Sequence, residues 1–353
     1  MKVGVPTEIK TLEGRVALIP AAAAELVRAG HEVLVQRGAG ELSGYSDGDY
    51  ERVGVRLLPD ATTLYGEAQL IVKVKEPQPG EFELLRPDHL LFCYLHLAAE
   101  PEVLNALLGI GLTAVAFETV AEDGMLPLLA PMSDIAGKVA VQVGTHLLHR
   151  PEGGRGILLG GLPGTERGHV VVLGAGVAGG SAAALAASMG AQVTVFDRSR
   201  DKLAAMRAIG NNVSGLYAYA DAIEQAVREA DLLVGAVLIR GARAPHLVSA
   251  DTVGAMRDGA VIIDISVDQG GCIETTRPTS YADPTFVHKG VIHFGVTNMP
   301  GAVPRTASQA LSAAITPYLL RLVRPGWESE PALAVGVNVR AGEVVLDALK
   351  GGE

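Results

Sequence analysis

The feature that most constrains the fold of this chain is a run of uncharged residues from His169 to Phe196, HVVVLGAGVAGGSAAALAASMGAQVTVF. A run of this length without Asp, Glu, Lys or Arg is long enough to cross a bilayer. Five glycines interrupt it, however, and it divides into a β-branched part, an Ala-rich part and a second β-branched part. This pattern predicts a strand, a glycine turn, a helix and a second strand, and it argues against a membrane span.

Gly174, Gly176 and Gly179 have the G-x-G-x-x-G spacing of a dinucleotide-binding turn. The first permits a tight turn, the second lets backbone N–H groups approach a pyrophosphate, and the third allows the helix to pack closely on the strand. The motif alone is weak, but here it lies between a strand and a helix, and the next strand ends in Asp197. The unit therefore predicts a dinucleotide site, and a glycine-rich joint without nucleotide is the alternative.

Asp197 gives the direction of the cofactor preference. A carboxylate at this position accepts hydrogen bonds from the adenosine ribose hydroxyls and repels a 2′-phosphate, which favours NAD over NADP. Arg198 and Arg200 follow closely and weaken this preference.

Short β-rich runs alternate with helical stretches along the chain, which predicts parallel sheets with crossover helices. A first set of strands precedes residue 118 and a second begins at His169. The predicted fold class is therefore α/β with two doubly wound, Rossmann-like domains. The expected strands are Val3–Pro6, Glu32–Gln36, Gln69–Lys75, Leu90–Leu95 and Thr113–Phe117, then His169–Leu173, Gln192–Phe196, Asp231–Val234 and Ala260–Ile263.

A long helix is expected to join the two sets, over Asp134–His149 with Ser133 as its N-cap. Pro304–Leu322 is predicted to be a helix that returns to the first domain. We therefore expect a substrate domain of residues 1–127 and 305–353 and an inserted NAD-binding Rossmann domain of residues 128–304. Two chain crossings make a natural hinge around a cleft.

Composition excludes several functions. The chain of 353 residues has 29 Lys+Arg, 39 Asp+Glu, a formal net charge of −10 and 4% aromatic residues, so nucleic acids and anionic membranes are poor partners. The N-terminus MKVGVPTEIK lacks the apolar stretch of a signal peptide, and we expect a cytoplasmic protein. Cys93 and Cys272 are expected to be buried free thiols, and no cluster with metal-ligand spacing is found.

Asp268 is the first candidate for chemistry. It follows the apolar strand AVIIDI and precedes a Gly-Gly turn, at the strand end where ligands bind in such sheets. Partial desolvation there would raise the pKa of its carboxyl toward a useful acid/base range. A turn aspartate that bonds its own backbone is the alternative.

Three basic residues of the first domain are further candidates. Arg15 follows a loop, Lys75 ends QLIVKVK and His96 ends LLFCYLH, so the last two should emerge on the same side of a parallel sheet. Arginine can hold a carboxylate by two parallel hydrogen bonds, lysine adds a point charge, and histidine can exchange a proton near neutral pH. A solvated surface arginine, a strand-edge lysine and a structural histidine are the alternatives.

The chain resembles the alanine dehydrogenase family over nearly its whole length. The similar segments include EGRVALIP, VKVKEP, YLHLA, APMSDIAGK, DISVDQGGCIETTRPT and GVTNMPGAVPRTAS. The resemblance implies reversible NAD-dependent oxidative deamination of L-alanine to pyruvate and ammonium. It also implies an N-terminal substrate domain, completed by a C-terminal segment around an inserted NAD domain, and a homohexamer.

The resemblance also implies roles for the candidates. Arg15 and Lys75 would bind the carboxylate and carbonyl of the substrate, and His96 and Asp268 would form the acid/base pair. The residues implied to bind NAD are Ser133, Gly174, Gly176, Val177, Ala178, Gly179, Asp197, Lys202, Val237, Leu238, Ile265, Ser266, Val267, Asp268, Arg277, Val296, Thr297, Asn298 and Met299.

One segment departs from the family pattern, which often has a serine near the start of the stretch aligned to Tyr217–Asp221, at the adenosine edge. Here that stretch is Tyr-Ala-Tyr-Ala-Asp. Other functions are kept open: the NAD-binding subunit of a proton-translocating transhydrogenase, a saccharopine- or lysine-type dehydrogenase, and a catalytically silent NAD-binding module.

Overall fold

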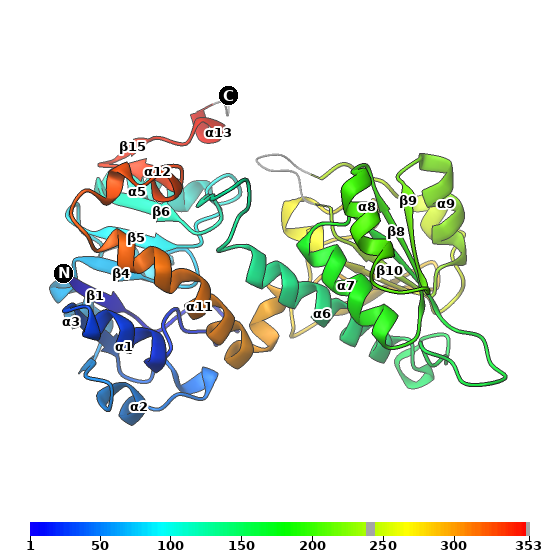
Figure 1. The fold of residues 1–353 in the computed structure, drawn as a ribbon, viewed down its shortest axis with the longest axis horizontal. Helices are drawn as coiled ribbons and strands as arrows, with labels where there is room; N and C mark the ends of the chain where they lie inside the picture. Colours follow the sequence, from blue (N-terminus) through cyan, green and yellow to red (C-terminus); the bar gives the residue numbers. More distant parts are fainter. Residues whose placement is uncertain (238–243, 351–353) are drawn as a thin grey trace. The chain divides into compact units, whose positions relative to one another are not determined.

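The computed structural model describes residues 1–237 and 244–350, which divide into two compact units (Figure 1). Unit 1 comprises Met1–Met132 and the chain from Gly301 onward, and unit 2 comprises Ser133–Pro300. The chain passes between them within α6 (Ala130–Leu147) and within the 3-10 helix η4 (Met299–Ala302). The chain therefore crosses between the two units after residues 132 and 300, a few residues from the domain boundaries expected after residues 127 and 304. Two parallel-dominated sheets with interleaved helices, one unit inserted into the other, confirm the predicted fold class.

In the described part of unit 1 the sheet has eight strands in the order β15-β14-β6-β5-β4-β1-β2-β3. The strands from β6 to β3 pair in parallel, and β14 and β15 add an antiparallel edge. Their bounds are β1 Lys2–Val5, β2 Glu32–Gln36, β3 Arg56–Leu58, β4 Leu70–Val72, β5 Leu90–Cys93, β6 Thr113–Ala116, β14 Val337–Arg340 and β15 Glu343–Val344.

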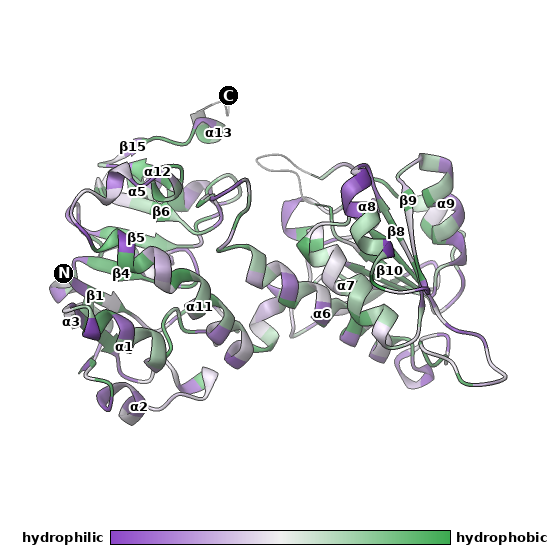
Figure 2. Ribbon diagram, in the orientation of Figure 1, coloured by the Kyte–Doolittle hydropathy of each residue, from purple (hydrophilic) through white to green (hydrophobic). Residues whose placement is uncertain are grey.

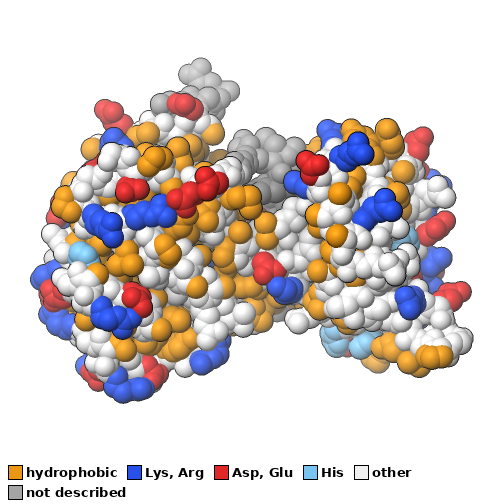
Figure 3. All heavy atoms as spheres, viewed as in Figure 1, with side chains coloured by type: hydrophobic (Ala, Val, Ile, Leu, Met, Phe, Trp, Pro, Cys, Tyr) orange, Lys and Arg blue, Asp and Glu red, His pale blue; other side chains and the backbone are white. Residues whose placement is uncertain are grey.

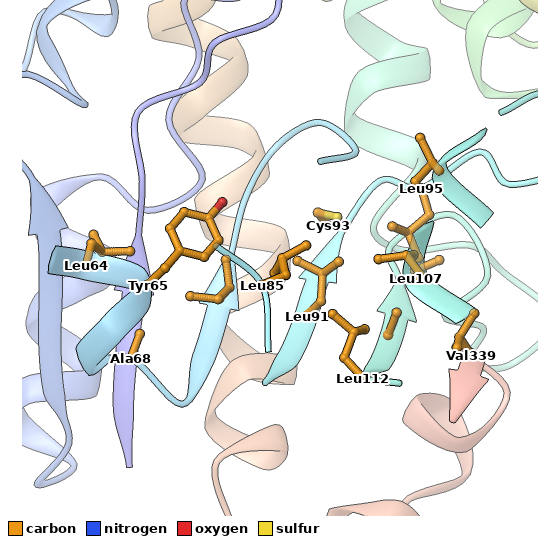
Figure 4. Close-up of a cluster of buried hydrophobic side chains, with 14 of the residues drawn as sticks. Leu64, Tyr65, Ala68, Leu85, Leu91, Cys93, Leu95, Leu107, Leu112 and Val339 are labelled. Carbon is orange, nitrogen blue, oxygen red and sulfur yellow. The ribbon is translucent and has the colours of Figure 1, made fainter. Parts of the chain in front are cut away.

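Helices cover this sheet because alternate residues of its buried strands point to opposite faces. On one face, Leu91 and Cys93 of β5 pack against α3 and α5, and Figure 4 shows Tyr65 and Leu107 of these helices beside them. The helical segments of unit 1 are α1 Pro20–Arg28, η1 Glu41–Ser43, α2 Asp47–Glu51, α3 Ala61–Glu67, α4 Pro79–Phe82, α5 Pro101–Ile110, α11 Pro304–Leu322, η5 Trp327–Ser329, α12 Pro331–Ala334 and α13 Asp347–Lys350.

Helix α11 belongs to unit 1 although it follows unit 2 in the sequence, and it packs against α1 (Figure 1). Two buried serines fasten it to the segment before α1. Ser308 Oγ accepts from the Val16 N–H at 2.9 Å, and Ser312 Oγ accepts from the Ile19 N–H at 3.0 Å. Ser312 also donates to the carbonyl oxygen of Ala17 at 2.8 Å, so the two ends of the sequence are joined by hydrogen bonds.

In the described part of unit 2 the sheet has seven strands in the order β12-β13-β11-β10-β7-β8-β9. All pairs are parallel except β12 with β13. Their bounds are β7 His169–Leu173, β8 Gln192–Asp197, β9 Val213–Tyr217, β10 Leu232–Gly235, β11 Val261–Asp264, β12 Thr285–His288 and β13 Val291–Phe294.

The helical segments of unit 2 flank both faces of its sheet, whose strands are coloured as hydrophobic in Figure 2. Glycines bring α6 close to its neighbours: a Cβ at Gly137 would lie 2.2 Å from the Ala178 carbonyl oxygen, and one at Gly144 would lie 2.6 Å from Leu232 Cδ1. Besides α6 and η4, the segments are η2 Arg150–Glu152, α7 Val177–Ser188, α8 Arg200–Arg207, α9 Ala220–Glu229, α10 Ala250–Gly254 and η3 Ile265–Gln269.

Two sequence expectations require correction. Helix α6 begins at Ala130, with Pro131 in its first turn, so Ser133 lies inside the helix and is not its N-cap. Strand β4 ends at Val72, short of the expected Gln69–Lys75, because the Val74 and Lys75 N–H groups bond a carboxylate instead of a neighbouring strand. The unpredicted strands are β3, β9, β12, β13, β14 and β15.

The surface and the thiols add little chemistry. On the visible face of each unit, acidic and basic side chains are interspersed with apolar ones (Figure 3). Among the described residues, no helix combines the length and the apolar character needed to cross a bilayer. Cys93 and Cys272 are both buried and unpaired, as expected.

We predict that Ser312→Ala destabilises unit 1. The side chain is 1% exposed, and its loss leaves the Ile19 N–H and the Ala17 carbonyl without this partner. We expect the free energy of unfolding to fall by about 1–3 kcal/mol, measured by denaturant titration. The control Ser329→Ala removes an exposed serine of the same unit, with an expected change within about 0.5 kcal/mol. Equal effects of the two variants would contradict this role.

Candidate active site

The carboxyl ends of adjacent strands gather the three basic candidates of unit 1. Arg15 lies in the segment between β1 and α1, Lys75 follows β4 and His96 follows β5, and β1, β4 and β5 are neighbours in the sheet. Chain order reverses direction across this sheet between β1 and β4. Ligands of open α/β sheets bind at such a switch point, outside the carboxyl ends of the strands.

Arg15 is buried, with 3% of its surface exposed, so it is not a solvated surface charge. Its Nε and Nη2 donate to the two carboxylate oxygens of Glu13 at 2.6 and 2.5 Å, and Nη1 lies 3.2 Å from Met132 Sδ. Burial lowers the pKa of the guanidinium, but the bonds to Glu13 outweigh it, and the net pKa is raised. The two-point contact with Glu13 fixes the plane of a group suited to carboxylate recognition.

Lys75 lies in a dense field of charge. Its Nζ is 3.6 Å from Glu76 Oε2, and the other oxygen of this buried carboxylate accepts from Lys10. Burial raises the pKa of Glu76, but the charges of Lys75 and Lys10 more than offset this, and the net pKa is lowered. Glu76 is therefore held as a carboxylate near neutral pH, and the ammonium of Lys75 is kept close to the strand end.

His96 is exposed and adopts a left-handed backbone conformation with φ of 48°. Its ring stacks on Tyr94, with centroids 5.8 Å apart and planes at 8°. Tyr94 in turn donates its hydroxyl to the Leu128 carbonyl at 2.6 Å. Tyr94 thus supports the ring of His96, and Arg15 and His96 both lie beyond strand ends at one edge of the sheet.

The glycine turn of unit 2 has the geometry expected of a dinucleotide-binding turn. Gly174 has φ of 97°, and a Cβ on it would lie 2.5 Å from the Ala236 carbonyl oxygen. A Cβ on Gly179 would lie 1.8 Å from the Gly174 oxygen, whereas one on Gly176 would meet nothing within 4 Å among the described residues. Gly176 is the N-cap of α7, and no side chain of the described residues caps this end. The start of α7 therefore presents backbone N–H groups beside open space, which fits a pyrophosphate.

Asp197 is the last residue of β8 and contacts this turn directly. Its Oδ2 accepts from the Ala175 N–H at 2.8 Å, and its Oδ1 accepts from the Ser199 N–H at 2.8 Å. Each carboxylate oxygen has more than one lone pair, so these bonds orient Asp197 and leave acceptor capacity for ribose hydroxyls.

The segment after β11 corrects one expectation. Asp268 lies in η3 and is exposed, so the desolvation inferred from its apolar surroundings is not found at this residue. The buried carboxylate is Asp264, which accepts from the Ser266 and Cys272 N–H groups at 2.9 and 3.0 Å and from Thr276 Oγ1 at 3.0 Å. Burial raises the pKa of Asp264, and these bonds hold the segment that carries Asp268.

Most of the remaining nucleotide candidates also follow carboxyl strand ends of unit 2. Val237 lies just beyond β10. Leu238, the next candidate, lies outside the described residues. Val296, Thr297, Asn298 and Met299 follow β13, Ile265–Val267 follow β11, and Lys202 lies in α8. Arg277 stands over the Phe286 ring at 4.5 Å, at the antiparallel edge. Ser133 precedes Asp134, whose carboxylate accepts from Ser181 of α7.

The stretch Tyr217–Asp221 places aromatic side chains next to Asp197. Tyr217 ends β9 in register with Asp197, and its ring lies 4.7 Å from that of Tyr219. Both tyrosines are exposed. The stretch therefore presents an exposed aromatic pair next to the end of β8.

Sequence reasoning missed the buried and partly buried acids beside the candidates. Glu8, Glu13, Glu118 and Asp264 each hold a predicted residue or the backbone next to it. Only Glu13 carried a local signal, since it lies two residues before Arg15. Tyr94 could have been found from its place two residues before His96.

Fold and site together define a two-unit Rossmann-type α/β protein, with a dinucleotide-type glycine turn in one unit and cationic side chains at the corresponding sheet edge of the other. The chain belongs to the alanine dehydrogenase/PNT family. The family's N-terminal domain model matches residues 4–136, and its C-terminal domain model matches residues 140–347.

Similar proteins cover the chain almost completely. An alanine dehydrogenase of Halomonas elongata is 48% identical, over 99% of this chain and 96% of its own length. A solved L-alanine dehydrogenase has a TM-score of 0.95 and 49% identity, covering 99% of this chain and 98% of its own. A transhydrogenase from Sinorhizobium meliloti has a TM-score of 0.85 and 25% identity, covering 99% and 100%.

We predict opposite effects for two glycines of the turn. Gly179→Ala forces a methyl group against the Gly174 oxygen and should lower the free energy of unfolding by about 1–3 kcal/mol or more. Gly176→Ala should leave stability within about 0.5 kcal/mol of the parent. Its methyl group, however, occupies the space in front of α7, so the Kd for NADH should rise about tenfold, or about 1.4 kcal/mol.

Thermal unfolding and NADH fluorescence titration measure these two effects separately. Unchanged NADH affinity in Gly176→Ala would show that the pyrophosphate does not approach this turn.

Proposed function

We propose that this chain is an NAD-dependent L-alanine dehydrogenase, which converts L-alanine, water and NAD reversibly to pyruvate, ammonium, NADH and a proton. The observation that carries the proposal is the gathering of Arg15, Lys75 and His96 at the carboxyl ends of neighbouring strands, in a member of the alanine dehydrogenase/PNT family. The near-complete coverage of the similar alanine dehydrogenases supports it.

The proposed roles follow from the chemistry of each side chain. Arg15, fixed in plane by Glu13, binds the substrate carboxylate, and Lys75 adds a positive charge at the carboxylate and carbonyl. Such positioning can contribute about 7–11 kcal/mol toward lowering the barrier. His96 and Asp268 are the proposed acid/base pair.

The protons move at stated steps. The nicotinamide cofactor, when bound, would supply the acceptor for the hydride of the substrate Cα. His96 and Asp268 move protons as water adds to the substrate iminium carbon and as the carbinolamine releases ammonia to give pyruvate. Each group is expected to contribute about 10²–10⁴-fold to the rate.

Unit 2 supplies the proposed cofactor site. The fit rests on the open space at Gly176 and on the orientation of Asp197 beside the turn. The residues proposed to hold NAD are the individual residues that the resemblance implies, of which Ser133 is the first and Met299 the last in the sequence. Asp197 favours NAD over NADP because a 2′-phosphate would face its charge.

A second function has its own support. The transhydrogenase from Sinorhizobium meliloti shares the fold over the whole chain. A protein of that kind passes hydride between nicotinamide nucleotides and does not require Arg15, Lys75 and His96 to bind an amino acid. The presence of Arg15 and Lys75 beyond neighbouring strand ends of unit 1 therefore favours alanine dehydrogenase.

We expect NADH to form from NAD when L-alanine is added, and NADH to be consumed with pyruvate plus ammonium, followed by the near-ultraviolet absorbance of NADH. His96→Ala should lower kcat about 10²-fold or more while NADH binding persists. Folded protein that is inactive in both directions would refute the dehydrogenase, and NADH-dependent reduction of an NADP analogue without amino acid would support the transhydrogenase.

We predict that a substitution in the substrate site of unit 1 changes substrate binding alone, and that a substitution in the cofactor site of unit 2 changes cofactor binding alone. Arg15→Lys keeps a positive charge opposite buried Glu13 but loses the planar fork, so the KM for pyruvate and alanine should rise about tenfold or more. Asp197→Asn removes the charge but keeps the size, and the NADP/NAD affinity ratio should rise about tenfold. The two effects should be nearly additive in the double variant.

Steady-state kinetics and NADH titration without substrate distinguish the two sites. If Arg15→Lys weakens NADH as much as pyruvate, Arg15 does not serve the substrate. If the selectivity of Asp197→Asn is unchanged, Asp197 is not the ribose acceptor.

The proposal extends to assembly and location. The family resemblance supports a homohexamer in the cytoplasm, without nucleic-acid or membrane partners. Light scattering of the purified chain tests the assembly, and a mass near that of one chain would contradict it.

A further inference from the structure

Two glutamates stand beside the two strands that carry Lys75 and His96. Glu8 lies just beyond β1 and Glu118 just beyond β6, and in the sheet β1 and β6 flank the adjacent pair β4 and β5. All four strands thus have the same arrangement: each inner strand is followed by a candidate residue, and each outer strand is followed by a carboxylate.

Glu8 binds the backbone that leads into Lys75. Its Oε1 accepts from the Val74 N–H at 2.6 Å, and its Oε2 accepts from the Lys75 N–H at 3.4 Å. Lys73 Nζ donates to the same Oε2 at 3.3 Å. One carboxylate thus holds two successive peptide groups at the point where β4 has ended.

A buried ion cluster keeps Glu8 in this position. Lys73 is fully buried and also contacts Glu81 Oε1 at 2.7 Å, and Glu81 accepts from the Tyr65 hydroxyl at 2.7 Å. Tyr65 and Cys93 are labelled in the apolar cluster beneath (Figure 4). Burial raises the pKa of Glu8, and the charge of Lys73 opposes this shift. A buried carboxylate without such a partner would be too costly to retain.

Glu118 does the same for His96. Its Oε1 accepts from the Leu95 N–H at 3.2 Å and from the His96 N–H at 2.6 Å. His96 has a φ of 48°, a backbone conformation that residues other than glycine rarely adopt. The surrounding contacts must therefore maintain it. The bond from the His96 N–H to Glu118 is one such contact, beside the Ala99 N–H that donates to the His96 carbonyl oxygen at 2.8 Å and the stacking on Tyr94.

We propose that Glu8 and Glu118 are positioning residues for alanine dehydrogenation: they fix the peptide groups from which Lys75 and His96 extend. This assignment rests on the proposed function. Because a carboxylate can accept several N–H groups at once, it sets the orientation of two consecutive peptides and hence the direction in which the next side chain leaves. Glu8 then acts through substrate binding, and Glu118 acts through proton transfer.

The two roles predict different kinetic signatures. Glu118→Ala should lower kcat about tenfold to a hundredfold with little change in the Kd for NADH, because displacement of a reacting group by about 1 Å has effects of that size. Glu118→Gln keeps an acceptor oxygen and should recover most of this loss. Glu8→Gln places an amide N–H against Lys73 and the Lys75 N–H, and it should raise the KM for pyruvate about tenfold with kcat nearly unchanged.

Asp60→Ala is the matched control. Asp60 is an exposed carboxylate of the same unit that also accepts a backbone N–H, that of Thr63 at 2.7 Å, as the N-cap of α3. Its loss should lower stability without changing kcat or KM. Thermal unfolding of all four variants and of the parent accompanies the kinetics.

Each outcome decides between the assignments. Parent-like kinetics in Glu118→Ala, an equal loss in Glu118→Gln, or an equal loss in Asp60→Ala would overturn the positioning role. For Glu8, an unchanged KM for pyruvate would do the same. Absence of alanine-dependent NADH formation by the parent chain would instead overturn the proposed function, and this assignment with it.

Discussion

Parallel strand pairing is the constraint on which the rest of this structure depends. It brings the carboxyl ends of neighbouring strands to a common edge, so residues that are distant in sequence become neighbours there. Unit 1 has the order β3-β2-β1-β4-β5-β6, and unit 2 repeats it as β9-β8-β7-β10-β11-β13. In each unit the chain changes direction once across the sheet, beside the first strand of that unit.

The two switch points have the same strand order, but different kinds of residue lie at them. In unit 2 the turn is built from glycines: the Gly174 turn lies against Ala236, and a Cβ on Gly176 would meet no atom of the described residues within 4 Å. In unit 1 the crevice is filled by the chain's own Glu8 and Lys73, both buried. The same fold can thus hold a nucleotide in one copy and build a charged framework for a small anion in the other.

Sequence patterns gave the regular parts of this architecture and missed those that depend on distant contacts. Strand β7 and helix α11 have the predicted bounds because periodicity and flanking prolines or glycines are local signals. Strands β14 and β15 escaped notice because they are short and join an edge formed hundreds of residues earlier. Partial desolvation was expected at Asp268, but this residue is exposed and the buried carboxylate of the segment is Asp264. The Glu8 contact with Lys75 joins distant parts of the sequence and leaves no local pattern.

The fastening of α11 by Ser308 and Ser312 has a consequence for how the protein is made. The partners of these serines lie between Val16 and Ile19, so unit 1 cannot complete its core until the last part of the chain has left the ribosome. Unit 2 is continuous in sequence and has all of its strands by then. Synthesis at about 5–20 residues per second leaves the part of unit 1 up to Met132 waiting for roughly 10–30 seconds while unit 2 is made. During that interval β6 lacks the β14 neighbour that later pairs with it, and its exposed edge is where misassembly during translation would begin.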